Sequence, residues 1–229
     1  SVHCQAAETN NDEKQPQTIR VGSFEDTFNY VDKNGVRRGY GYELMQALAG
    51  YTGWKFEYVK CDWSNCFDKL ENGEIDIMGD ISYTDERAQK MLFPDEPMGE
   101  EKYILYADLS DTDIGMSDFK SLDGKRVGVL MDTEPEIMLT EWENKNGIHT
   151  EHVNVNNDDD VEKKLANHEI DCFVSLEEST WSEQGISSVT TIGKSGIYFA
   201  INKERSNIKT ELDLSLIHIS EPTRRRGIS

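Results

Sequence analysis

Basic residues are scarce in this sequence of 229 residues, which has 24 Lys and Arg against 44 Asp and Glu and a formal net charge of −20. Nucleic acids and anionic membrane surfaces attract basic faces, so this balance makes them poor partners, and we expect no nucleic acid to bind. No apolar run reaches the roughly 18 residues that a membrane-spanning helix needs. A nucleotide-binding loop is also missing, because Leu44 stands where "GYGYEL" (39–44) would need its third glycine. We expect no cofactor.

Cysteine and histidine are few as well, with four and five copies. Cys61 and Cys66 bracket "CDWSNC" and could pair in an oxidising compartment or remain buried thiols. No second cysteine pair or histidine pair accompanies them, as a zinc site would require. The acidic run 158–160 is better interpreted as a helix start, where Asn157 or Asp158 caps the first turn and early carboxylates suit its positive end. We therefore predict no metal site.

The two ends of the sequence differ from the rest. Residues 1–17 resemble the end of a secretory signal followed by a polar leader, although an ordinary polar N-terminus would look similar. From Leu214 onward, "LSLIHISEPTR" resembles the translation of a sequencing adapter, and a genuine basic tail is the alternative. We expect residues 214–229 to be non-native and the natural chain to be truncated here.

Between the ends, strand-like and helix-like segments alternate. Alternating or β-branched runs predict strands, and apolar residues at helical spacing that end at a glycine predict helices. The series strand–helix–strand–helix–strand is predicted twice, first over 18–24, 39–53, 55–61, 64–73 and 74–78, then over 124–130, 134–147, 149–155, 158–169 and 170–174. A further strand is expected within 195–204. Two such units predict an α/β protein with mainly parallel strands and a ligand site between two lobes.

An ordered series of motifs resembles one known family. It consists of "IRVGSFE", "GYGYELMQALAGYTGWKFEYV", "WSNCFDKLENGEIDIM", "ISYTDERAQKMLFPDEPM", "SLDGKRVGVL" and "IDCFV", and it covers about residues 18–205. The family is that of the bacterial extracellular solute-binding proteins of the polar amino-acid type, with the type II periplasmic-binding-protein fold. The resemblance implies two mixed, mainly parallel sheets with flanking helices and a hinge. The implied boundaries are 18–99 for lobe 1, 100–194 for lobe 2 and 195–213 for an incomplete return to lobe 1.

The resemblance also implies a ligand site. Arg87 matches the arginine that binds a ligand carboxylate, Ser82 the hydroxyl beside it, and Asp80 a position whose backbone carbonyl meets the ligand amine. The other implied contacts are the pocket residues Trp63, Phe24 and Tyr30 and the helix-start residues Asp132 and Thr133. A guanidinium offers two parallel donors to a carboxylate, and hydroxyls with helix-start amides complete such an anion site.

Two observations leave the ligand and some residue roles open. On spacing alone, Trp63 could lie in the core and Arg87 could pair with a nearby carboxylate, that of Asp85, Glu86 or Asp95. Amino-acid binders carry acidic residues at positions that here correspond to Phe24 and Leu176, although Glu25, Asp26 and Glu177 lie close by. An α-amino acid is therefore one small carboxylate among several that the site could take.

The implied function is the capture or sensing of a small carboxylate-bearing ligand by closure of two lobes, without catalysis. The implied partner is an ABC permease, or a fused membrane histidine kinase or diguanylate cyclase. The implied location is the periplasm or the outer face of the cell membrane. The alternative is an enzyme on the same fold, similar to cyclohexadienyl dehydratases, with Glu25, Asp26 or Glu177 as general acid or base.

Overall fold

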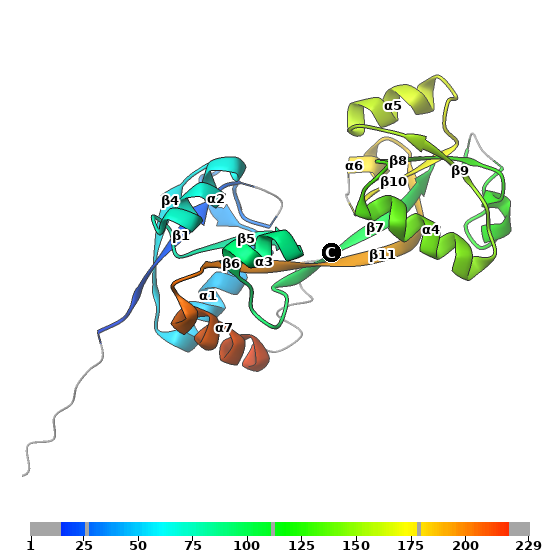
Figure 1. Ribbon diagram of the computed structural model, residues 1–229. Helices are drawn as coiled ribbons and strands as arrows, with labels where there is room; N and C mark the ends of the chain where they lie inside the picture. Colours follow the sequence, from blue (N-terminus) through cyan, green and yellow to red (C-terminus); the bar gives the residue numbers. More distant parts are fainter. Residues whose placement is uncertain (1–14, 26–27, 111–112, 178–179, 220–229) are drawn as a thin grey trace, which may run out of the picture. The chain divides into compact units, whose positions relative to one another are not determined.

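The computed structural model describes residues 15–25, 28–110, 113–177 and 180–219 (Figure 1). The chain divides into two units. Unit 1 contains the residues up to Met98 and those from Tyr198 onward, and unit 2 is the single continuous segment Gly99–Ile197. Each unit has strands with helices packed on them, so the predicted α/β class is confirmed.

Unit 1 starts with the predicted series of strands and helices. Its first strand, β1 (Thr18–Ser23), lies between β4 (Lys55–Lys60) and β5 (Ile77–Ser82) and is parallel to both. The other elements are β2 (Tyr30–Val31), β3 (Arg37–Arg38), α1 (Tyr40–Thr52), α2 (Trp63–Asn72), α3 (Asp85–Lys90), β6 (Met91–Leu92) and α7 (Ser206–His218).

Local signals position the helices of unit 1. Asp62 and Asn65 form a capping box at the start of α2: Asp62 Oδ1 accepts the N–H of Asn65 at 2.9 Å, and Asn65 Oδ1 accepts the N–H of Asp62 at 3.1 Å. Gly53 and Gly73 end α1 and α2 with φ of 73° and 77°, a conformation that costs glycine little. The predicted glycine stops are therefore confirmed.

Unit 1 has a core on each face of its sheet. On one face, α2 buries Cys66 and Leu70 in a cluster with Met78 and Ile81 of β5. Helices α1 and α7 contact each other (Figure 1) and bury Leu44, Leu48, Ile208, Leu212 and Leu216. Helix α7 continues through 214–218, the first residues of the stretch that the sequence attributes to an adapter, and its Leu216 is fully buried. The origin of that stretch stays a prediction.

Unit 2 repeats the same order of elements. Strand β8 (Arg126–Val129) lies between β9 (Glu151–Asn154) and β10 (Cys172–Leu176) and is parallel to both. The other elements are β7 (Gly99–Ala107), the short 3-10 helix η1 (Phe119–Leu122), α4 (Glu134–Asn146), α5 (Asp158–Ala166) and α6 (Thr180–Glu183). Asn157 caps α5 by accepting the N–H of Asp160 at 2.9 Å, so the predicted helix start is confirmed.

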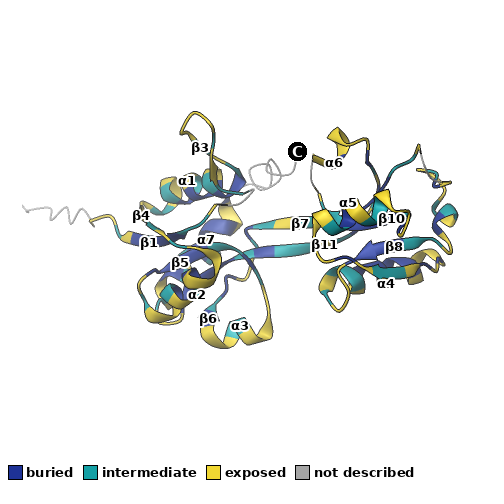
Figure 2. Ribbon diagram, turned by 90° about the horizontal axis from the view of Figure 1, so that it is seen from above, coloured by how far each residue is buried: buried dark blue, intermediate teal, exposed yellow. Residues whose placement is uncertain are grey.

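Alternate residues of β7 show how the helices of unit 2 divide between the faces of the sheet. Leu105 packs in the cluster that contains Leu139 of α4, and Ile104 packs in the cluster that contains Val161 of α5. This alternation is the period of two expected of a strand. Helices α4 and α5 accordingly lie on opposite sides of β8 and β10, whose residues are largely buried (Figure 2).

One long strand, β11 (Ser187–Asn202), takes part in both units. In unit 2 it runs antiparallel to β7 from Ser187 to Ile197. In unit 1 its last residues pair with β6 and follow β5 in the strand order. Two separate sheets were expected, but the shared strand makes the order continuous, β4-β1-β5-β11-β7-β10-β8-β9.

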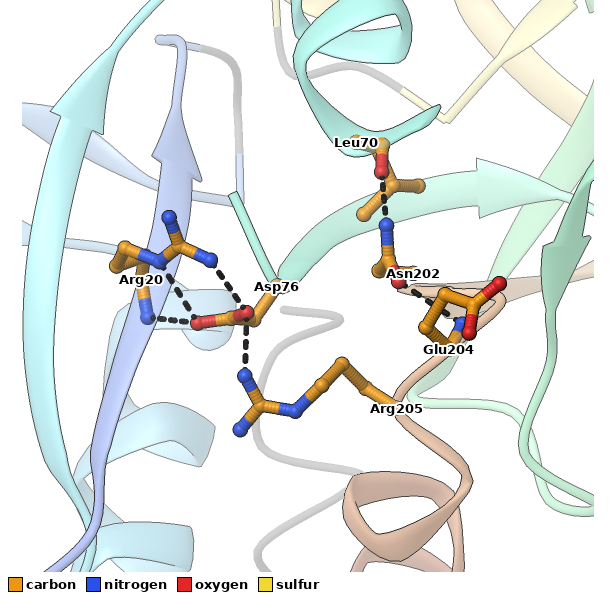
Figure 3. A network of polar contacts seen from close by, with 6 residues as sticks. All are labelled: Arg20, Leu70, Asp76, Asn202, Glu204 and Arg205. Atoms are coloured by element: carbon orange, nitrogen blue, oxygen red, sulfur yellow. Dashed lines mark hydrogen bonds and ion pairs between the residues drawn. The ribbon is translucent and has the colours of Figure 1, made fainter. Parts of the chain in front are cut away.

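A buried carboxylate connects β1 of unit 1 to the segment that returns to it. Asp76 accepts hydrogen bonds from Arg20 Nη2 at 3.0 Å and from Arg205 Nη1 at 2.8 Å (Figure 3). Beside it, Asn202 donates to the carbonyl of Leu70 at 2.6 Å. The Asp76 side chain is 2% exposed. Burial raises its pKa, but the bonds from Arg20 and the charge of Arg205 outweigh this and hold the pKa below its ordinary value.

Two details of unit 1 differ from what the sequence pattern indicates. The third strand was predicted over 74–78, but β5 begins at Ile77 and continues through Gly79 to Ser82. Gly79 therefore does not end the strand. It packs against Met98 and Phe199, and a Cβ atom added to it would lie 3.4 Å from Met98 Sδ. Tyr51 has the spacing of the apolar residues of α1, but it is 53% exposed and stacks on His218.

The cysteines behave differently in the two units. Cys61 and Cys66 form a disulfide across 5.3 Å between Cα atoms, which resolves the open choice between a bridge and two thiols. In unit 2, burial raises the pKa of the Cys172 thiol to about 12.

Among the described residues, none of the helices is long and apolar enough to cross a bilayer.

Candidate functional site

Three aromatic side chains form a row in unit 1. Phe24 directly follows β1, and its ring centre lies 5.2 Å from that of Trp63, the first residue of α2. Trp63 in turn meets Phe67 edge-to-face at 5.1 Å. The capping box and the Cys61–Cys66 disulfide fix the loop that presents Trp63. Trp63 is 44% exposed, so it does not belong to the core and offers an open aromatic surface.

Arg87 lies at the Phe67 end of this row and adds a positive charge to it. Its Cζ lies 5.1 Å from the centre of the Phe67 ring, within cation–π range. Its Nη1 donates to the backbone carbonyl of Ser82 at 2.9 Å. The Thr84 hydroxyl caps α3 by accepting the Arg87 N–H at 3.1 Å, which fixes the helix that carries the guanidinium.

None of the ion pairs within the described residues involves Arg87. Two of the carboxylates that could have paired with it contact other partners: Glu86 approaches Lys90 at 3.9 Å, and Asp95 approaches Lys209 at 3.1 Å. An arginine carries five N–H donors, and the contact with Ser82 uses one of them. The structure therefore presents a positioned guanidinium that can still bind an anion.

A hollow of unit 1 adjoins Phe24. Its lining consists of Val21, Gly22, Phe24, Asn29, Gly41, Met45, Gly79, Asp80, Met98 and Phe199. Asp80 has φ of 62°, a left-handed conformation that aspartate tolerates better than bulky residues do. Its backbone N–H points at Met98 Sδ, 3.2 Å away. The hollow thus lies between the end of β1, the middle of β5 and the first turns of α1.

The predicted site residues of unit 1 do not all come together. Phe24 and Asp80 line the hollow, and Trp63, Ser82 and Arg87 belong to the connected row. Tyr30 lies outside both sets, on β2, where it pairs with Arg38 and is 38% exposed. Its neighbour Asn29 lines the hollow instead.

Apart from Phe24 and Asp80, sequence reasoning missed the lining of the hollow, and Asn29, Met45 and Met98 are the side chains of most interest among those missed. Met45 could have been found from its position in "GYGYELM", since it lies one turn after Gly41 on α1. Met98 follows a loop and reaches the hollow only through the fold, where its carbonyl accepts the Tyr40 hydroxyl at 2.6 Å. No local pattern marks that contact.

The other predicted anchor residues lie in unit 2, between β8 and α4. Asp132 has φ of 59°, and its N–H donates to Glu136 Oε1 at 3.1 Å. The Thr133 hydroxyl donates to the carbonyl of Leu130. The N–H of Met131 donates to Asn154 Oδ1 at 3.1 Å. These bonds hold an exposed turn at the amino end of α4, where backbone N–H groups favour anions.

The acidic residues near the aligned family positions are peripheral. Glu25 and Glu177 are exposed, and the Glu177 N–H donates to the carbonyl of Lys102 at 2.9 Å. Leu176 is half-buried in β10, opposite Tyr103. Asp26 and the predicted signal remnant within 1–14 lie outside the described residues.

Comparison with known proteins identifies the family. The model of the bacterial extracellular solute-binding proteins, family 3, matches residues 19–208. This chain belongs to that family, as its motifs predicted. The family is extracellular or periplasmic, and the fold of this chain is the one that its members share.

Individual relatives agree with this assignment. The chain is 30% identical to the histidine-binding periplasmic protein of Escherichia coli K12 over 124 residues, 53% of this chain and 46% of that protein. It spans less than half of the length of the curated relatives that it matches.

Solved structures show the same fold. The probable amino-acid ABC transporter extracellular-binding protein ytmK from Bacillus subtilis superposes with a TM-score of 0.73 at 22% identity, covering 93% of this chain and 96% of that one. A histidine kinase sensor domain with similarity to periplasmic binding proteins gives 0.63 at 21% identity, covering 93% and 97%.

Proposed function

We propose that this chain captures or senses a small carboxylate-bearing ligand, such as an amino acid, between its two units. The observation that carries the proposal is the guanidinium of Arg87, which is positioned by Phe67 and Ser82 and has no ion-pair partner among the described residues. In this proposal Arg87 and Ser82 bind the ligand carboxylate from unit 1. The turn at Asp132 and Thr133 binds it from unit 2.

The aromatic row and the hollow support an amino-acid ligand. Phe24 and Trp63 would cover its apolar part, and the Asp80 carbonyl would accept a hydrogen bond from its amine. The printed name of the Escherichia coli relative, a histidine-binding protein, supports the same class. Because neither Phe24 nor Leu176 can neutralise an ammonium group, a carboxylate without one is the ligand to test beside the amino acids.

The decisive experiment is a binding screen with a matched pair of arginine variants. Calorimetry with the twenty L-amino acids and with small carboxylates that lack an amine should find a ligand that binds one to one. Removing one partner of a desolvated charge pair costs about 3 kcal/mol, so Arg87→Ala should weaken binding roughly 100-fold. Arg87→Lys should recover part of this loss, because a lysine keeps the charge but not the planar fork.

The control is Arg38→Ala, in the same unit. Arg38 contacts Asp32 at 2.6 Å in the β2–β3 hairpin, outside both the aromatic row and the lining of the hollow, and its side chain is 59% exposed. This variant should bind as the unaltered protein does. A ligand that binds Arg87→Ala and Arg38→Ala equally well would remove Arg87 from the site.

Closure and output can be tested next. Ligand should reduce the radius of gyration in small-angle X-ray scattering, since we propose that binding draws the two units together. The bound form would be read by an ABC permease or by a fused membrane signalling protein. Uptake of radiolabelled ligand in cells that express the chain with a candidate permease would favour transport, and ligand-dependent kinase or cyclase output would favour sensing.

We propose no chemical step. The acidic residues that an enzyme would use, Glu25 and Glu177, are exposed rather than enclosed. A bound amino acid or carboxylate should be recovered unchanged by NMR after long incubation. Catalytic turnover of the ligand would favour the dehydratase-like alternative.

A further inference from the structure

A histidine in unit 2 lies between two carboxylates. His152, on β9, places Nδ1 2.9 Å from Glu136 Oε2 and Nε2 2.9 Å from Glu143 Oε1. Both glutamates come from α4. Glu143 is 5% exposed and also accepts the hydroxyl of Thr150. The imidazole is thus held on both nitrogens by acceptors.

This geometry fits a doubly protonated ring. A neutral imidazole has one N–H, so one of the two carboxylates would then face a lone pair. Burial lowers the pKa of His152, but the bonds to Glu136 and Glu143 outweigh it, and the pKa is raised above the ordinary value of 6.5. The bond to Glu136 is the one that should fail first on deprotonation, because the Glu143 side chain is 7% exposed and that of Glu136 is 19% exposed.

Glu136 connects this histidine to the turn between β8 and α4. Its second oxygen, Oε1, accepts the N–H of Asp132 at 3.1 Å. The bond from the Asp132 amide, followed by that from His152, lowers the pKa of the Glu136 carboxyl. The Glu136 side chain therefore links His152 to Asp132, the residue of the turn that has a left-handed conformation. Losing the contact with His152 frees Glu136 to leave the Asp132 amide.

Several other charged groups on the elements around His152 form contacts of their own. On β8, Arg126 binds Asp171, and it lies opposite Glu151 of β9. On α5, Lys164 contacts Asp160 at 3.1 Å and donates to the Asn154 carbonyl at 2.7 Å. Helix α4 also carries Glu134, Glu141 and Lys145. Within the described residues, the ion pairs of His152 are those with Glu136 and Glu143.

We propose that His152 and Glu136 are positioning residues for the turn Leu130–Thr133 and that they couple ligand affinity to the protonation state of His152. Protonated His152 holds Glu136, Glu136 holds the Asp132 amide, and the turn thereby keeps its conformation at the amino end of α4. Deprotonation releases the turn. The coupling to affinity rests on the proposed function, whereas the coupling between His152 and the turn does not.

The ligand-free protein tests the positioning directly. In NMR titrations from pH 5 to pH 9, the Asp132 amide should shift with the same midpoint as the His152 ring protons, above 6.5. In Glu136→Gln the Asp132 amide should no longer follow the histidine, and in His152→Gln it should not titrate in this range. The control His149→Gln alters an exposed histidine just before β9 and should leave the titration unchanged.

Affinity is the second readout. For whichever of the twenty L-amino acids or small carboxylates binds, Kd should rise at least about fivefold as the pH passes through the His152 midpoint, the low end of typical coupling between sites. His152→Gln should flatten this profile. An Asp132 amide that stays constant while His152 titrates would overturn the positioning role. An absence of any ligand, with the amide coupling intact, would instead count against the proposed function.

Discussion

The two units of this protein are two versions of one scaffold. Each has a central first strand with the second strand on one side and the third on the other, in the orders β4-β1-β5 and β9-β8-β10. Each first strand contains "RVG", at 20–22 and at 126–128, and each helix before the third strand is followed by "EID", at 74–76 and at 169–171. These motifs meet in space, because β1 and β8 each pair with the strand that follows their "EID".

The arginine of one motif binds the aspartate of the other in the same way in both units. Arg20 donates to Asp76 from its backbone N, Nε and Nη2 at 2.8, 3.2 and 3.0 Å. Arg126 donates to Asp171 from the same three atoms at the same three distances. Two parallel charged hydrogen bonds make this a strong pair. We interpret it as the clamp that fixes the register between the first and third strands.

The difference lies in what surrounds each clamp. Asp76 also receives a bond from Arg205 in the returning segment, and its side chain is 2% exposed (Figure 3). Asp171 is 26% exposed, and its ion pair within the described residues is the one with Arg126. The shared clamp therefore supports the scaffold, while the third partner makes unit 1 depend on a segment that follows unit 2 in the chain. The candidate ligand contacts of unit 1 lie elsewhere, on β5, α2 and α3 and just after β1.

The largest expected effect comes from breaking the two clamps separately. Asp76→Ala leaves Arg20 and Arg205 without their shared acceptor and should destabilise unit 1 by roughly 3 kcal/mol, at the low end for a buried pair because Arg20 reaches solvent. Asp171→Ala should cost less, since water can solvate Arg126. Urea unfolding of both variants would measure the two values. Equal losses would contradict the distinct role of Arg205.

The disulfide of unit 1 has no counterpart among the described residues of unit 2. Closing so short a loop constrains the unfolded chain by about 2 kcal/mol in the entropic model. The double variant Cys61→Ser, Cys66→Ser should lower the free energy of unfolding by that amount and make it insensitive to dithiothreitol. It should also weaken ligand binding, because the loop that presents Trp63 is released. Cys172→Ala, which affects neither the loop nor its redox sensitivity, is the control.

The glycine of each "RVG" motif lies close to the isoleucine of the corresponding "EID" motif, so an alanine at either glycine would overpack the core. An alanine Cβ at Gly22 would lie 2.7 Å from Ile75 Cδ1, and one at Gly128 would lie 2.9 Å from Ile170 Cδ1. Gly22→Ala and Gly128→Ala should each destabilise the protein by about 1 kcal/mol, because an isoleucine terminus can yield. Gly50→Ala on α1 meets nothing within 4 Å and should stabilise by up to about 1 kcal/mol. Calorimetric melting temperatures would rank the three, and a stabilised Gly128→Ala would show that the two units tolerate different packing.

The smallest expected effect is the pH dependence of the clamps. Arg126 holds the pKa of Asp171 below its ordinary value of 3.8, and the pKa of Asp76 is lowered as well. The stabilisation by each aspartate is fully present above the pKa that the side chain has in the unfolded chain. It is lost as the pH falls through the lower pKa that the side chain has in the folded protein. Stability should therefore decline below about pH 4. Asp76→Asn and Asp171→Asn should each flatten part of this decline in urea midpoints measured from pH 2 to pH 6, and an unchanged slope in both would exclude the clamps as its source.

Much of the scaffold could be predicted from sequence, because its signals are local. Gly53 and Gly147 mark helix ends, and Asn157 marks a helix start. The clamps were not predicted, because Arg20 and Asp76 are 56 residues apart and each looks like an ordinary surface residue in its own segment. The relay through His152 was missed for the same reason: Glu136 lies 16 residues away, and no motif indicates that the pair meets.

The candidate site shows where residue patterns mislead. Ser82 and Thr84 look alike in the sequence, but Thr84 caps α3, and Ser82 offers its backbone carbonyl to Arg87. Tyr30 was placed by alignment with the family, yet the hairpin turns it toward Arg38 and brings Asn29 to the hollow. A one-residue change in a hairpin exchanges which side chain faces inward, and single-sequence reasoning has no measure of that register.

The last residues of β11 and all of α7 belong to unit 1 but are made after unit 2. On the ribosome, Gly99–Ile197 emerges as one complete segment that can fold as soon as it clears the exit tunnel. Until β11 is made, β5 lacks its neighbour in the sheet. The first 98 residues then have an open sheet edge, to which other chains can pair. Unit 1 is complete only when the returning segment arrives and Arg205 reaches Asp76.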